Sequence, residues 1–164
     1  MSTSTNFTPY DNNNSGFAVG AKYVPGPRAA IWHEGKINLL HPLTGPPSLA
    51  YGINERTVVV GEAYYSAFDS HAFIWTESSG MTDLSPLAAD SVAADVNDRD
   101  QVVGSSAGHA FIWKDGKLQF IDGLVDDAQG WSFNSAAAIN NRGQIVGLGT
   151  FDGSIRAFMI SPKE

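Results

Sequence analysis

The chain alternates short apolar runs with clusters of polar turn residues, and this pattern repeats four times. In each copy an asparagine is followed seven residues later by a glycine, within the blocks NNSGFAVG, NERTVVVG, NDRDQVVG and NNRGQIVG. The asparagines are Asn13, Asn54, Asn97 and Asn140, and the glycines are Gly20, Gly61, Gly104 and Gly147. Successive asparagines lie 41, 43 and 43 residues apart. This period is typical of propeller blades and solenoid units, so the repeat sets the architecture.

Each copy predicts a hairpin followed by further strands. Residues 50–54, 93–97 and 136–140 predict the first strand, and the apolar end of each block begins the second after a polar turn. A basic residue then opens a third strand in the runs RAAIW, HAFIW, HAFIW and RAFMI. A leucine-rich piece follows in the first three copies and predicts a fourth strand. At the turn we expect either a different conformation or strain at Thr57, because a branched Cβ resists positive φ.

No segment shows convincing helical periodicity, so the pattern indicates an all-β protein. Four sets of short strands at ~10-residue spacing predict a four-bladed β-propeller. The repeats span residues 9–45, 46–88, 89–131 and 132–164 of a single domain, residues 1–164. The last repeat shows only three strands, and we expect residues 2–8 to supply the fourth and close the ring. An open β-solenoid and half of a dimeric eight-bladed propeller are the alternatives.

Composition and charge exclude several classes of binding partner and site. Only 16% of residues are charged and the net charge is −7, which disfavours nucleic acid and anionic membranes as partners. Cysteine is absent, which excludes disulfides and thiolate zinc sites. Residues 1–16 lack the cationic and apolar regions of a secretion signal, and no apolar run approaches the ~18 residues of a membrane span. We expect a cytoplasmic location if Met1 is the native start, and an extracellular one otherwise.

The pattern A-x-x-I-N-x-x-G-x-V-V-G, then H-A-F-I-W, then G-x-x-x-x-L, resembles the HAF repeat, a family of tandem bacterial repeats often described as extracellular. The match covers residues 9–160 and is weaker in the first copy, where Asn12 replaces the apolar residue and Ala30 the phenylalanine. The resemblance implies a propeller-like β-array and no single activity. The missing secretion signal departs from the extracellular label, so the location is not carried over.

Residues shared among the copies divide into scaffold and candidate site. Large aromatic residues are expected to fill the spaces between adjacent sheets: Trp32, Trp75, Trp113, Phe73, Phe111 and Phe158. The basic residues that open the third strands would form one ring in a closed propeller: Arg28, His71, His109 and Arg156. Such a ring could bind an anion or carboxylate. The alternative is that each basic residue tethers a neighbouring loop.

Specific function is expected where the copies disagree. The insertion in the second copy holds Glu62, Tyr64 and Tyr65, and an unmatched segment before the last repeat holds Trp131. Aromatic residues beside carboxylates suit a pocket for a small polar molecule or a carbohydrate. The favoured function is therefore a binding module that presents asymmetric aromatic and acidic loops on a propeller scaffold, and homodimerisation is compatible with it.

The alternative function is a small propeller enzyme, such as a lyase, cyclase or isomerase. Its acid–base groups would be Glu62, Asp95, His71 and His109 at one mouth of the ring. No recognised catalytic motif links these residues in the sequence. We expect no cofactor, and two histidines without a neighbouring carboxylate make a poor metal site.

Overall fold

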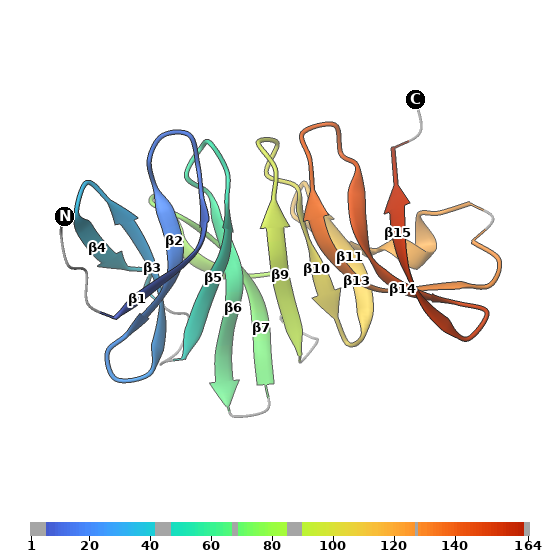
Figure 1. Cartoon of the computed structure of the whole chain (residues 1–164), viewed down its shortest axis with the longest axis horizontal. Coiled ribbons are helices and arrows are strands. Elements are labelled where there is room, and N and C mark those ends of the chain that lie inside the picture. The colour runs from blue at the N-terminus through green and yellow to red at the C-terminus, as the bar shows by residue number, and fades with distance from the viewer. Residues whose placement is uncertain (1–5, 42–46, 67–68, 85–89, 127, 163–164) are drawn as a thin grey trace.

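In the computed structural model, residues 6–41, 47–66, 69–84, 90–126 and 128–162 are described, and they form four antiparallel sheets in a row (Figure 1). The first sheet contains β1 (Phe7–Asn12), β2 (Ala18–Tyr23), β3 (Pro27–His33) and β4 (Lys36–Leu39). The second contains β5 (Ser48–Ile53), β6 (Val59–Ser66), β7 (Asp69–Thr76) and β8 (Gly80–Asp83). The third contains β9 (Ser91–Val96), β10 (Val102–Ser106), β11 (His109–Lys114) and β12 (Lys117–Phe120). The last contains β13 (Trp131–Ile139), β14 (Ile145–Phe151) and β15 (Ser154–Ile160).

This arrangement confirms the all-β prediction and the four repeated units. The one helical element in the described ranges is a short 3₁₀ turn, η1 (Ile121–Gly123), which follows β12. Within each sheet the strands lie in chain order, so every pairing joins neighbours in sequence. Each repeat is therefore one locally connected sheet.

The asparagine of each repeat builds the turn between the first two strands. In the second sheet, Asn54 Oδ1 accepts hydrogen bonds from the backbone N–H groups of Arg56 at 3.0 Å and Val58 at 2.9 Å. Thr57 has φ of 61°, and Asp100 at the same place in the third sheet has φ of 57°. The turn is thus the same in both sheets, and Thr57 adopts the left-handed conformation that its branched Cβ disfavours. Of the two alternatives predicted for Thr57, the turn is not a different one, and it holds Thr57 at the positive φ that was expected to strain it.

The glycine of each repeat is required by a close backbone approach. The first strand of each sheet bulges opposite the second, as between Ala50 and Gly52. A Cβ on Gly61 would lie 1.9 Å from the carbonyl oxygen of Leu49, and a Cβ on Gly104 would lie 1.9 Å from that of Val92. No side chain fits at these distances, so glycine recurs with the period of the bulge.

Adjacent sheets pack face to face through apolar side chains. We call the side of a sheet that packs against the following sheet its forward face, and the opposite side its rear face. In the first interface, Val19, Ala29 and Ile31 of the forward face contact the rear face of the second sheet, which includes Val59 and Phe73. Phe111 and Phe158 stand in the place of Phe73 in the next two interfaces. All three phenylalanines are buried, and the partly buried Trp75 and Trp113 pack beside them, so these aromatic residues fill the inter-sheet spaces as expected. Trp32 lies on the rear face of the first sheet, which no described sheet covers, so the expectation fails for Trp32.

The four asparagine turns also connect the sheets to one another. The Nδ2 of Asn13 donates to the carbonyl of Asn54 at 3.0 Å, Asn54 donates likewise to Asn97 at 2.9 Å, and Asn97 to Asn140 at 3.1 Å. The first three asparagines are buried and Asn140 is exposed. We call this series the asparagine ladder. It gives the row a direction, because each amide points to the following sheet.

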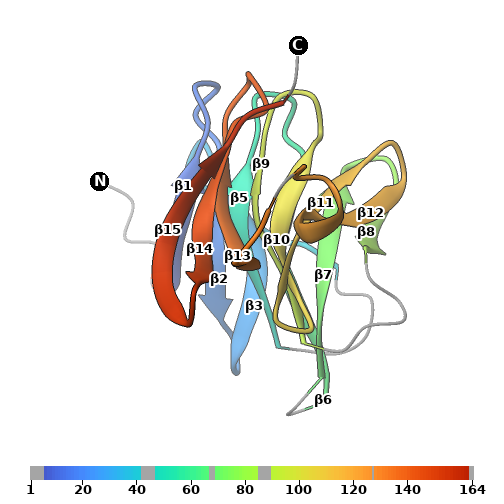
Figure 2. The same cartoon turned by 90° about the vertical axis from the view of Figure 1, so that its right-hand side faces the viewer.

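Ring closure is not detected in the described part of the chain. The first and last sheets lie at opposite ends of the row in Figure 1, and the turned view of Figure 2 looks along the row onto the last sheet. β15 pairs with β14 and forms the edge of its sheet. Of the segment expected to supply the missing strand, Phe7 and Thr8 pair instead with Lys22 and Ala21 of the first sheet. Residues 1–5 lie outside the described ranges.

Candidate functional site

The four basic residues do not meet at one site. They lie near the start of the third strand in four successive sheets. The side chains of His71, His109 and Arg156 contact groups of their own sheet or of the turn that follows it. The Nδ1 of His109 lies 3.4 Å from an Asp122 oxygen, and the Arg156 guanidinium lies 5.9 Å from the centroid of the Phe151 ring. Arg28 Nε is buried and has no hydrogen-bond partner among the described residues. A closed ring would have brought the four basic residues together, whereas the row of sheets keeps them apart.

His71 is the most strongly held of the four. Its Nδ1 lies 2.7 Å from Asp83, its Nε2 lies 3.0 Å from Asp69, and the Tyr65 ring packs at 4.4 Å between centroids. Burial alone lowers the pKa of His71, but the hydrogen bonds and charges of the two aspartates outweigh it and raise the pKa. The imidazole is therefore favoured as a cation between two carboxylates, which suits an ion pair better than a general base.

Glu62 lies in a cluster of tyrosines that the sequence indicated only in part. The hydroxyl groups of Tyr51 and Tyr64 donate to Glu62 Oε1 at 2.5 and 3.0 Å, and Glu62 is buried. Burial and the hydrogen bond to Glu62 raise the pKa of Tyr51, which keeps the phenol protonated. Sequence reasoning missed Tyr51, although Tyr10 stands at the same position of the first repeat and its ring lies 5.6 Å away.

Asp95, the other carboxylate of the enzyme hypothesis, joins the third sheet to the last. One oxygen accepts the backbone N–H of Val96 at 2.8 Å, and the other accepts that of Ile139 at 2.8 Å. Burial raises the pKa of Asp95, while these two backbone hydrogen bonds oppose the rise. Both carboxylate oxygens are thus engaged by the backbone.

Trp131 lies at the start of β13, away from the tyrosines of the second sheet. Its ring stacks on Phe133 at 5.7 Å and lies 5.2 Å from Phe151. Tyr64 and Tyr65 lie near the end of β6. The loop aromatics expected to share one pocket therefore belong to two different sheets.

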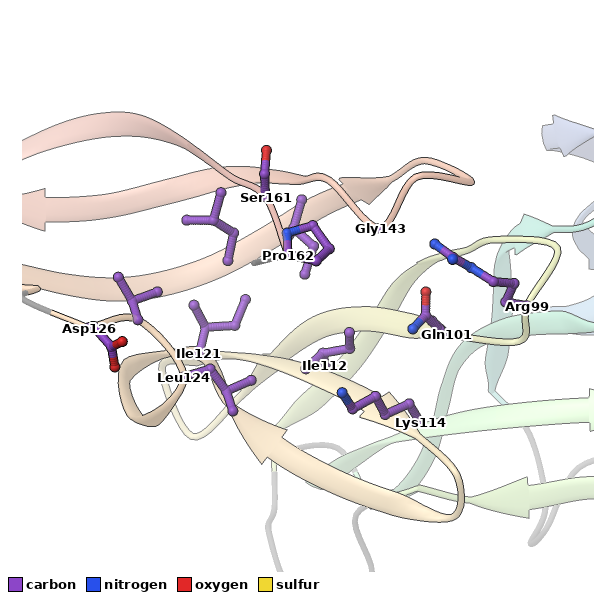
Figure 3. Close-up of a pocket in the computed structure, with 13 residues that line it drawn as sticks. Arg99, Gln101, Ile112, Lys114, Ile121, Leu124, Asp126, Gly143, Ser161 and Pro162 are labelled. Carbon is purple, nitrogen blue, oxygen red and sulfur yellow. The ribbon is translucent and has the colours of Figure 1, made fainter. Parts of the chain in front are cut away.

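A pocket of about 620 Å³ lies between the third and last sheets (Figure 3). Its apolar lining comes from β11, η1 and the segment after it, and β14 and β15: Ile112, Ile121, Leu124, Val125, Ile145 and Ile160. Arg99, Gln101 and Lys114 lie toward one end and Asp126 at the other (Figure 3). Of these residues, sequence reasoning singled out only Asp126, in the unmatched segment before the last repeat.

The pocket exists because the last sheet has one strand fewer than the others. In the second sheet, Met81 on β8 packs into the first interface together with Ile31 and Leu40 of the preceding sheet. Ile112 and Ile121 are the counterparts of Ile31 and Leu40, and both line the pocket. The last sheet offers no described strand to carry a counterpart of Met81, so these two buried side chains line a pocket instead of packing against a fourth strand. The missing leucine-rich piece of the last repeat was the available sequence signal.

The described residues hold no group of three His, Asp or Glu side chains arranged to bind a metal ion. None of their helices has the length and apolar character needed to cross a membrane. Comparison of the chain with protein-family models, with curated proteins and with solved structures finds no match to any of them.

Proposed function

We propose that this protein is a binding module that takes an extended polypeptide segment as a fourth strand of its last sheet. The observation that supports this proposal is the pocket beside β15, which lies where β8 and β12 place a side chain in their own sheets. The ligand strand would insert one apolar side chain between Ile112 and Ile160. The pocket thus gives selectivity, and the strand edge gives backbone hydrogen bonds.

The edge of β15 supports the same proposal. In the second and third sheets the third strand is covered by the fourth, as Phe73 pairs with Asp83 and Phe111 with Phe120. Phe158 is their counterpart on β15, where the outer edge has no paired strand in the described ranges. Unpaired strand edges recruit other strands because their backbone groups still need partners.

The charges of the pocket indicate which segments fit. Arg99 and Lys114 at one end favour an acidic group in the ligand, in a chain whose net charge is otherwise −7. The floor between the ends is aliphatic, which favours an apolar side chain over the carbohydrate expected from the loop aromatics. In the β8 sequence Gly80–Asp83 the apolar residue is Met81, which pairs with Trp75, the counterpart of Ile160. Asp83 pairs with Phe73, the counterpart of Phe158, and so lies away from the basic end.

The enzyme hypothesis has less support. Glu62 pairs with Ala72, and His71 pairs with Ala63, the residue after Glu62. Neighbouring positions of a strand point to opposite faces, so Glu62 and His71 lie on opposite sides of the second sheet. They cannot act together on one substrate.

For the architecture we propose an open array of HAF-type blades rather than a closed four-bladed ring. The repeat blocks that resemble the HAF family form the hairpins and inter-sheet contacts of all four sheets. An open array retains a free strand edge at its end, which the proposed binding function needs.

A peptide with the chain's own β8 sequence tests the function. Residues 78–84, Ser-Ser-Gly-Met-Thr-Asp-Leu, fill the equivalent place in the second sheet and serve as the probe. By isothermal titration calorimetry we expect the peptide to bind the full chain with a Kd of about 10–100 μM. The same peptide with aspartate in place of its methionine should not bind.

Matched protein variants locate the site. Leu124 lines the pocket and is 44% exposed, whereas Leu39 lies on β4 and is 40% exposed. Leu124→Glu should weaken peptide binding at least tenfold, and Leu39→Glu should leave it unchanged. Absence of binding at about 1 mM peptide, or equal binding of the two peptides, would contradict the proposal.

A further inference from the structure

The last sheet exposes an apolar forward face. Val146 pairs with Met159 and Leu148 with Ala157, so these four side chains lie on one side of β14 and β15, together with Ile155. Their exposed fractions are 40% for Val146, 52% for Leu148, 68% for Met159 and 80% for Ile155. The last sheet stands at the free end of the row (Figure 2).

The same face is buried in every other sheet. Val19, Val60 and Val103 are the counterparts of Val146, and Ala29, Ala72 and Ala110 are the counterparts of Ala157; all six are 0% exposed. In each case the rear face of the following sheet covers them. The exposed forward face of the last sheet is therefore an interface that lacks its partner sheet, and it is not a surface adapted to water.

Hydrogen bonding indicates what the partner sheet looks like. The amide of each of the first three asparagines donates to the carbonyl of the next, whereas Asn140 donates to Gln144 of its own turn at 2.8 Å. At the opposite end, the Asn13 carbonyl accepts from Gly16 N–H in its own turn and, within the described ranges, from no preceding asparagine. The two ends of the asparagine ladder are thus complementary.

The aspartates that bridge successive sheets also indicate that a sheet like the first one would follow the last. Asp11 in the first sheet accepts the backbone N–H of Asn12 at 2.8 Å and that of Ile53 in the second at 2.9 Å. Asp95 does the same between the third and last sheets. The second and last sheets carry Gly52 and Ala138 at this position. Because sheets with and without the aspartate alternate, the sheet that follows the last one should carry the aspartate, as the first sheet does.

Side-chain sizes are reversed at the two ends. On the forward face, Leu148 stands where the other sheets have Ala21, Glu62 and Ser105. On the rear face of the first sheet, Ala30 stands where the others have phenylalanine. Leu148 is larger than Ala21 and Ser105 and, unlike Glu62, it is apolar, while Ala30 leaves room on the rear face that phenylalanine fills in the other sheets.

We propose that a second copy of this chain covers the exposed forward face with the rear face of its first sheet, head to tail. Two copies that join in this way at both ends form a closed ring of eight sheets, and further copies form a longer row. The contact extends the asparagine ladder from Asn140 to Asn13 of the second copy and buries Val146, Leu148 and Met159.

Two charged variants test the direction of the contact. Leu148→Glu/Met159→Glu places charges on the forward face of the last sheet. Pro9→Arg/Asn12→Arg places charges on the rear face of the first sheet, where both residues are exposed and pair with Gly20 and Ala18. Val24→Glu, at a residue 46% exposed beyond the end of β2, is the control for added charge.

The molar mass in solution is measured by light scattering after gel filtration, across a range of chain concentrations. We expect the wild type and Val24→Glu to reach two or more chains by about 1 mM, and each double variant to associate at least 100-fold more weakly. An equimolar mixture of the two double variants should recover a pair, because one intact face of each kind remains. Circular dichroism melting confirms that each variant is folded.

A wild type that stays at the mass of one chain overturns the proposal. So does a Pro9→Arg/Asn12→Arg variant that pairs with itself as well as the wild type does, because that result would show two last sheets packing on each other. Peptide binding beside β15 uses a different surface, so either proposal can fail without the other.

Discussion

Replacing the buried Asn54 separates the role of the asparagine in its turn from its role between sheets. In the folded chain, Asn54 Oδ1 accepts two backbone N–H groups, and its Nδ2 donates to the Asn97 carbonyl at 2.9 Å and to Asp100 at 2.8 Å. Asn140 makes the same turn through Arg142 and Gln144, but it is exposed and has no following sheet. Asn140→Ala is therefore the matched control for Asn54→Ala.

The magnitudes follow from burial. Asn54→Ala leaves the N–H of buried Val58 without its acceptor and removes one donor from the carbonyl of buried Asn97. The unsatisfied N–H of Val58 costs about 1–3 kcal/mol, and the Asn97 carbonyl, which still accepts the N–H of Asp100, loses one hydrogen bond worth about 1 kcal/mol. We therefore expect a loss of about 2–4 kcal/mol in the free energy of unfolding. At Asn140 water replaces the side chain, and the loss should be about 1 kcal/mol, as for an exposed cap.

Equilibrium unfolding in urea, followed by tryptophan fluorescence, measures the free energy of unfolding of both variants. The dependence of that free energy on urea concentration should be the same in both. Asn54→Asp adds a finer test, because it keeps an oxygen acceptor for the turn but replaces the amide donor beside Asn97 and Asp100. It should unfold nearly as easily as Asn54→Ala. If Asn54→Ala and Asn140→Ala differ by less than about 0.5 kcal/mol, the inter-sheet bond does not stabilise the row, and the reasoning fails.

Two further predictions concern the bulge glycine and the ion pair. Gly104→Ala should lower the melting temperature much more than Gly108→Ala. A Cβ at Gly104 would lie 1.9 Å from the Val92 carbonyl oxygen, whereas a Cβ at Gly108 would enter open space. At Gly108 only the positive φ of +78° opposes the substitution. His71 has a raised pKa, so its contribution to stability is complete below its unfolded value of 6.5 and is lost as the pH rises through the folded value. Urea unfolding between pH 5 and 9 should show this decline in the wild type and in His109→Gln, and a smaller decline in His71→Gln.

The sequence predicted those parts of the fold that depend on local chemistry. The turn at Thr57 and the inter-sheet position of Phe73 follow from residues close in sequence or from a position compared across copies. Ring closure depends instead on the small rotation between successive sheets, which no single repeat specifies. The period of the asparagines therefore predicts the sheets but not whether their row closes.

The candidate site was less accessible to prediction. Glu62 is a candidate from the sequence because it lies beside Tyr64 and Tyr65 in the insertion of the second copy, and Asp95 because the repeat does not require an acid at its position. The structure shows that Asp95 binds backbone of the following sheet, a contact that requires knowledge of how sheets stack. The pocket lining comes from residues such as Ile112 and Ile121, which are ordinary core residues in the other repeats. They line a pocket only because a strand is lacking in the next repeat, so no pattern within their own repeat distinguishes them.

The alternation of Asp11 and Asp95 with Gly52 and Ala138 bears on how a gene of this kind can change length. Excising the third repeat alone would set the last sheet directly after the second and deprive Ile139 of its carboxylate acceptor. Excising the second alone would place Asp11 against Asp95, where Gly52 now leaves its Cβ position only 3.2 Å from the Asp95 Cα. Excising or duplicating two consecutive repeats preserves both kinds of junction, so changes of length by pairs of repeats keep the inter-sheet contacts intact.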